Sequence, residues 1–276
     1  MRKLIAILLL LTVWPLAAPA QEAKREITRV TFDIYRFQNN FHVNIFVVTG
    51  AGVVVTDPIN EEAARWLREE IARITDEPIT HLIYSHSHLD HAAGGLGYGE
   101  VPNVIMQQNA PDDIDLVEST QRFRDQLSFD VGSKTFELTW LGPGHGRDLI
   151  AIVVRPDEVG FVVDAVSAKR LFYRDFPGTN VDDWIEQVRR VDSLDFDILV
   201  GGHGPVGVKR DVSLGLAYLE ELRAEVLAGL KAGKTVEQLK QEVTMEKYKD
   251  WENYDNWREL NVQGMARHLL ESGALQ

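Results

Sequence analysis

The chain has 276 residues, no cysteine and a formal net charge of −13. The absence of cysteine excludes disulfides and thiolate ligands, so a metal site would have to use His, Asp or Glu. The acidic charge disfavours contact with phosphate backbones, so we expect a small-molecule substrate and no nucleic acid. The sequence gives no indication of the oligomeric state.

The first twenty residues have the pattern of a secretory signal peptide. Arg2 and Lys3 precede an apolar run from Leu4 to Trp14, and Ala18-Pro19-Ala20 forms a small-residue cleavage site. The run is too short to span a bilayer, and the alternative interpretations are an uncleaved anchor or a buried helix. We predict a signal peptide at 1–20 and a periplasmic or secreted protein without membrane association after cleavage.

The first half of the remaining chain predicts a strand meander, then a helix and two more strands. Alternating or continuous apolar residues indicate the strands, and a 3.6-residue period with Asn60 as N-cap indicates the helix. The predicted strands are 27–37, 41–49, 53–57, 79–85 and 103–107, the helix is 60–75, and 110–126 is expected to be helix plus loop.

The second half predicts more strands and a helical C-terminal segment. We expect strands at 134–141, 149–155, 159–165 and 196–200, a loop at 167–178, and helices at 180–193, 209–232 and within 235–272. No linker or internal repeat interrupts residues 21–276, so we predict one domain. The order of elements indicates the α/β class, with two mixed sheets packed together and helices outside, a four-layer αββα sandwich.

A dense group of metal-type side chains follows the predicted strand 79–85. His86, His88, Asp90 and His91 lie within six residues, just before Ala92-Ala93-Gly94-Gly95. Buried His and Asp cost free energy unless they have partners, so packing alone seldom requires such a group. Neutral imidazole and carboxylate are ligands that zinc and similar divalent ions prefer.

Three more residues of this kind each follow another apolar run and have small neighbours. His145 lies in a Gly/Pro-rich loop, Asp164 ends a strand, and His203 lies in Gly-Gly-His-Gly-Pro. Taken singly, the histidines would equally suit loops in which they are satisfied by hydrogen bonds, and Asp164 a cap or turn. Strand ends are, however, where α/β folds place their sites, so together these residues extend the predicted metal site.

The series His-x-His-x-Asp-His, a lone His, a strand-terminal Asp and Gly-His-Gly-Pro resembles the metallo-β-lactamase-fold hydrolase superfamily. The resemblance covers almost all of the chain after the predicted signal and implies the same αββα sandwich. It also implies two metal sites with a fixed set of ligands. These would be His86, His88 and His145 on one metal, Asp90, His91 and His203 on the other, and Asp164 as the bridge. Asp57 would be an outer carboxylate that orients a ligand or loop.

The cofactor that this resemblance implies is a pair of Zn²⁺ ions, with iron or manganese as alternatives. Such ions share a hydroxide that attacks the substrate at neutral pH. Asp90 would be the catalytic residue, because it both binds metal and directs the proton of the hydroxide.

Ligand features that differ between subgroups of this superfamily narrow the range of expected reactions but do not identify the substrate. The commonest lactamase subclass uses a Cys ligand, which this chain lacks, and the all-histidine subclass usually lacks the bridging Asp, which this chain has as Asp164. The pattern is therefore more similar to glyoxalase II, lactonases and phosphodiesterases. We expect an exported zinc hydrolase of an ester, lactone, thioester or β-lactam. The alternatives are a non-hydrolytic exported accessory protein that handles a metal or cofactor, and a phosphodiesterase.

Substrate contacts are expected from Asn39–His42 and Ser167–Gly178, with Lys169 and Tyr173 as the polar candidates; the alternative is that both are solvated loop residues. For His42 itself, a structural role in a hairpin is favoured over a place on the pocket rim. Other conspicuous side chains are interpreted structurally: His81 as a core residue, His268 as helix surface, and Trp251, Tyr254 and Trp257 as packing.

Overall fold

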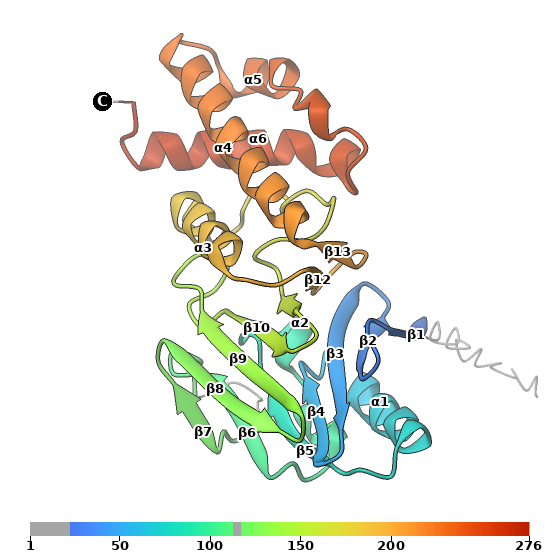
Figure 1. The fold of residues 1–276 in the computed structure, drawn as a ribbon. Coiled ribbons are helices and arrows are strands. Elements are labelled where there is room, and N and C mark those ends of the chain that lie inside the picture. Colours follow the sequence, from blue (N-terminus) through green and yellow to red (C-terminus); the bar gives the residue numbers. More distant parts are fainter. Residues whose placement is uncertain (1–22, 113–116, 276) are drawn as a thin grey trace, which may run out of the picture.

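Figure 1 shows the computed structural model of the chain, which describes residues 23–112 and 117–275. The predicted signal peptide at 1–20 lies outside the described residues. Within these described ranges, the first sheet has seven strands in sequence order. They are β1 (Arg25–Arg29), β2 (Ile34–Asn39), β3 (His42–Thr49), β4 (Gly52–Thr56), β5 (Ile79–Ile83), β6 (Asn103–Gln107) and β7 (Gln121–Phe123).

The second sheet, as far as the chain is described, has six strands in the order β13-β12-β11-β10-β9-β8. These strands are β8 (Gln126–Val131), β9 (Lys134–Trp140), β10 (Ile150–Arg155), β11 (Val159–Val162), β12 (Ile198–Gly201) and β13 (Gly207–Val208). The helices are α1 (Glu61–Ile74), α2 (Leu89–Ala92), α3 (Val181–Ser193), α4 (Lys209–Lys231), α5 (Val236–Glu242) and α6 (Tyr254–Glu271), with short 3₁₀ turns η1 (Gly95–Tyr98) and η2 (Glu246–Tyr248).

The two faces of the first sheet explain the layered arrangement. Along β3, the side chains of Val43, Ile45 and Val47 join the core that this sheet shares with the second sheet. Phe46, on the opposite face, packs in a separate core with α1. Because successive strand residues point to opposite faces, one strand supplies both cores. Figure 1 shows α1 beside the first sheet and α3 and α4 beyond the second, which confirms the predicted sandwich.

Two predicted elements were wrong. The predicted strand 27–37 is two antiparallel strands, because the chain turns at 30–33, where the N–H of Val30 donates to Ile34 O at 2.8 Å. The expected helix plus loop at 110–126 instead ends in strand β7 and the start of β8. In β7 only Phe123 is buried, so this edge strand has no alternating pattern to reveal it. Residues 113–116 of that segment lie outside the described residues.

Strand direction gathers several loops at one edge of the sandwich. β4 runs parallel to β5, and β11 runs parallel to β12, so in each pair both carboxyl ends point the same way. β10 is antiparallel to β9 and β11, which places the β9–β10 loop at the same edge as the end of β11. This edge is therefore where the predicted ligand loops meet. Within 23–112 and 117–275, no helix has both the length and the apolar character needed to cross a membrane.

Candidate metal centre

The structure brings all seven predicted ligands together in two adjoining groups. The first ligand group comes from the loop after β5, the β9–β10 loop and the end of β11. Its potential ligand atoms all lie within 4.8 Å of one another, and its members are His86, His88, His145 and Asp164. Two of its imidazole nitrogens, His88 Nδ1 and His145 Nε2, are only 3.0 Å apart.

The second ligand group contains a residue that the sequence did not predict as a ligand. Its potential ligand atoms also lie within 4.8 Å of one another, and its members are His42, Asp90, His91 and His203. His42 Nε2 is 3.4 Å from Asp90 Oδ2. The start of β3 lies here because β3 is antiparallel to β4 and the N–H of Val43 donates to Gly202 O at 2.8 Å. One histidine at a strand start has no local sequence signal, so only this tertiary pairing reveals it.

Asp164, a member of the first group, also contacts the second group. Its Oδ2 is 3.2 Å from His145 Nε2 in the first group and 3.4 Å from His91 Nε2 in the second. Its Oδ1 is 3.2 Å from His203 Nε2. The backbone of Asp164 has a φ of 55°, in the left-handed region that Asp tolerates better than most residues. The carboxylate is therefore in reach of both groups.

Buried ring nitrogens show that the residues present suit cations. His86 Nε2 and His91 Nε2 are both buried and make no hydrogen bond among the described residues; the nearby carboxylate oxygen, Asp164 Oδ2, lies 3.7 Å and 3.4 Å from them. Buried polar atoms without partners are costly and uncommon in folded proteins. Imidazole and carboxylate donors facing one another in this way match the preferences of zinc.

Asp57 orients the first group through Ser85. The Ser85 hydroxyl donates to Asp57 Oδ2 at 2.6 Å, and the Ser85 N–H donates to Asp57 Oδ1 at 2.7 Å. Ser85 Oγ therefore accepts from His86 Nδ1, which is 3.0 Å away. With its proton on Nδ1, His86 presents an unprotonated Nε2 to the site.

Helix α3 holds the His145 loop from the other side. The buried Gln187 amide accepts from the His145 N–H at 2.7 Å and donates to Gly142 O at 2.7 Å. The Trp184 ring lies edge-on to the His145 ring at a centroid distance of 4.8 Å. In the second group, His203 Nδ1 donates to Phe41 O at 2.7 Å, so in the neutral ring Nε2, which faces Asp164, is the nitrogen without a proton.

Burial and charge set the protonation of the site. Burial lowers the pKa of His86 well below its usual value, so the ring is neutral and able to bind metal. Burial also lowers the pKa of His91, but Asp164, Asp57 and Asp90 together outweigh it and raise this pKa to about 9. The hydrogen bond from His42 holds the pKa of Asp90 below its usual value, so that carboxylate is ionised at neutral pH.

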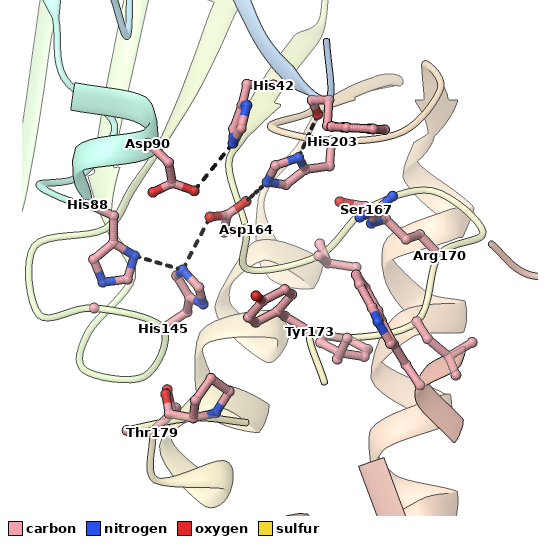
Figure 2. A pocket seen from close by; sticks show the side chains of 18 residues that line it. His42, His88, Asp90, His145, Asp164, Ser167, Arg170, Tyr173, Thr179 and His203 are labelled. Carbon is pink, nitrogen blue, oxygen red and sulfur yellow. Dashed lines mark hydrogen bonds and ion pairs between the residues drawn. The ribbon is translucent and has the colours of Figure 1, made fainter. Parts of the chain in front are cut away.

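A cavity of about 630 Å³ opens over both groups. Figure 2 shows His88 and Asp90 on one side of it and Arg170 and Tyr173 on the other. Tyr173 lines the cavity, as the sequence predicts, whereas Lys169 is exposed outside it and its neighbour Arg170 lines it instead. Trp257 of α6 packs against the main core, in keeping with the sequence interpretation, and it also lines the cavity.

The other two histidines lie outside both ligand groups. His81 is half-buried in β5 and stacks on Phe129 at a centroid distance of 5.4 Å, in keeping with a structural role. His268 was predicted on the helix surface, but its side chain is only 10% exposed and its Nε2 is 3.1 Å from Asp182 Oδ2. This contact with a residue of α3 could not be read from the period of α6.

The sequence model of the metallo-beta-lactamase superfamily matches residues 39–203, which include every member of both ligand groups. The chain therefore belongs to the metallo-beta-lactamase superfamily, which confirms the resemblance inferred from its motifs.

Individual relatives differ in what they are described to do. The chain is 27% identical to metallo-beta-lactamase type 2 of Elizabethkingia meningoseptica over 205 residues, 66% of this chain and 79% of that protein. It is 22% identical to the 2,4-dinitroanisole O-demethylase subunit alpha of Nocardioides sp. (strain JS1661) over 230 residues, 80% of this chain and 68% of that protein. Among solved structures, a metallo-beta-lactamase from Pontibacter korlensis superposes with a TM-score of 0.65 at 18% identity, covering 71% of this chain and 99% of that one. This last likeness concerns the fold alone.

Proposed function

We propose that the protein is an exported dinuclear zinc hydrolase that cleaves an ester, lactone, thioester or β-lactam carbonyl. The observation that supports it most is the meeting of two ligand groups at Asp164 on the floor of one cavity. His86, His88 and His145 would hold the first ion, Asp90, His91 and His203 the second, and Asp164 both. We add His42 as a residue that supports the second ion, through its contact with Asp90.

Bound zinc would supply an activated water and polarise the carbonyl oxygen. The chain itself orients the donors, because Ser85 and Asp57 fix the ring of His86 while Gln187 fixes the loop of His145. Asp90 is the proposed proton acceptor, since its carboxylate is ionised and half-exposed toward the cavity.

The two curated relatives suggest which bonds to test. One is described as a β-lactamase and the other as an O-demethylase of 2,4-dinitroanisole, an aryl ether. Carbonyl cleavage is favoured here because the acidic chain and its cavity offer little to a phosphate group. Arg170 is the one Lys or Arg among the described residues that line the cavity, and Glu252 pairs with it.

The test is zinc content together with a substrate panel. Purified mature protein should bind two zinc ions and hydrolyse at least one of nitrocefin, a lactone, a thioester or an aryl ester. Loss of this activity in His88→Ala, with the fold intact by circular dichroism, is expected. Protein that holds no metal, or a His88→Ala variant with full activity, would sink the proposal.

The alternatives give different results in the same panel. Bound zinc without turnover of any substrate would favour the accessory role, and faster cleavage of bis-nitrophenyl phosphate than of any carbonyl would favour a phosphodiesterase. Export is tested separately, by fractionating cells that express the full chain and by sequencing the mature N-terminus. Retention in the cytoplasm with Met1 in place would contradict it.

A further inference from the structure

The wall of the cavity that faces the ligand groups is aromatic. Phe41 from the β2–β3 turn, Phe172 and Tyr173 from the loop after β11, and Trp257 from α6 all line it. The Tyr173 and Trp257 rings meet edge to face at a centroid distance of 5.3 Å. Aromatic walls of this kind bind flat apolar groups through burial and ring contacts.

The cation on this wall is already neutralised. The guanidinium of Arg170 pairs with the Glu252 carboxylate and lies 4.9 Å over the Trp257 ring. The backbone holds this arrangement as well, because the Glu252 N–H donates to Lys169 O at 2.8 Å and the Leu171 N–H donates to Glu252 O at 3.1 Å. An arginine whose charge is matched in this way attracts an anionic substrate group less strongly than an unpaired arginine would.

We propose that this wall selects uncharged substrates that carry a planar apolar substituent, here called the arm. Aryl esters are the simplest class of such substrates. Trp257 and Tyr173 are the specificity-determining residues, and Glu252 excludes anionic arms by neutralising Arg170. This inference rests on the proposed hydrolase function, and names the substrate class that the same site would take.

Three acetate esters distinguish recognition of the arm by the wall from the hydrolytic reaction itself. Zinc-loaded wild-type protein is compared on phenyl acetate, on methyl acetate, which lacks the arm, and on 4-acetoxybenzoate, whose arm is anionic. Wild type should prefer phenyl acetate to 4-acetoxybenzoate. Trp257→Ala should lower kcat/KM for phenyl acetate about tenfold through KM and leave methyl acetate within about twofold.

Two further variants keep the inference falsifiable if Trp257→Ala does not fold. Tyr173→Ala alters a side chain that is half exposed on a loop, and should also lower the ratio of phenyl to methyl acetate. Glu252→Gln frees the charge of Arg170 and should raise the ratio of 4-acetoxybenzoate to phenyl acetate about tenfold. Trp251→Phe is the control, because Trp251 packs on Tyr218 and Tyr248 rather than on the cavity.

The outcomes distinguish an error in the proposed substrate selectivity from an error in the proposed hydrolase function. Equal loss on phenyl and methyl acetate in Trp257→Ala and Tyr173→Ala, or an unchanged ratio in Glu252→Gln, would overturn the inference while hydrolysis stands. If no ester is hydrolysed, titration calorimetry with acetanilide, an uncharged aryl amide, measures binding to the wall without requiring turnover. Binding to Trp251→Phe but about tenfold weaker binding to Trp257→Ala supports the inference, and equal binding to both overturns it.

Discussion

The two ligand groups use the same residue types but have different support. In the first, His86 and His145 are held by core side chains, through Ser85 and Asp57 and through Gln187. In the second, His203 is held by the backbone oxygen of Phe41 rather than by a core side chain. Each group has one exposed ligand, His88 in the first and Asp90 in the second, so the difference lies in the supporting hydrogen bonds and not in burial. Ligands fixed in advance by packing and hydrogen bonds lose less freedom when a metal binds. We therefore expect the first group to bind zinc more tightly than the second.

The largest expected effect comes from removing a ligand of the first group. His88→Ala should lower kcat/KM by more than about 100-fold, above the range typical of outer-shell changes, and should abolish the tighter of two zinc-binding steps. Stepwise zinc titration by calorimetry, with metal content by mass spectrometry, measures this. If only the weaker step disappears, the proposed order of the two sites is reversed.

Removal of His42 tests the second group. His42→Ala should weaken the second zinc-binding step roughly 100-fold and lower kcat/KM by a similar factor, because Asp90 loses its 3.4 Å partner. The tighter zinc-binding step should stay within about threefold of wild type. His81→Ala, at a histidine outside both groups, is the matched control. Equal weakening of both steps would mean that the two groups act as one unit.

Asp57→Asn removes the charge behind His86 while keeping the shape. It should weaken the tighter zinc-binding step about 10- to 100-fold and spare the weaker one.

Burial raises the pKa of Asp57 to about 6. In metal-free protein the neutral carboxyl therefore contributes stability below its unfolded pKa of about 3.9, and this contribution is lost as the pH rises to about 6.

The pH dependence gives the same variant a second readout. Between about pH 4 and pH 6, ionisation of Asp57 should cost the metal-free wild type on the order of 3 kcal/mol of unfolding free energy. Urea unfolding with metal removed should show this slope in wild type and not in Asp57→Asn. The same slope in both proteins would place the titration elsewhere.

Gln187→Leu should give the smallest effect. It removes the amide that holds His145 N–H and Gly142 O, so the loop loosens without loss of a ligand. We expect about tenfold weaker binding at the tighter step and an unchanged second step. Glu186→Gln, on the exposed face of the same helix, is the control. An equal effect in both variants would indicate general destabilisation of α3.

Local sequence was enough to predict the sandwich and most of the site, because the relevant residues follow apolar strands in a recognisable order. Asn60 and Asn180 could be identified as helix caps, and both accept hydrogen bonds from the first helical turn. His42 and Trp257 could not be placed in the same way. Their roles depend on strand pairing and helix docking between segments distant in sequence, and neither has a diagnostic neighbourhood of its own.

The contact between Arg170 and Glu252 joins two stretches that differ in their likeness to the superfamily. Both ligand groups lie within 39–203, where the superfamily pattern matches, but Glu252 and Trp257 lie beyond it. The proposed selectivity therefore depends only in part on residues beyond the superfamily match, because Arg170 and Tyr173 lie within 39–203. On this proposal, variation in the C-terminal helices would change the preferred substrate while every metal ligand stays the same, so likeness within 39–203 does not by itself identify the substrate of a relative.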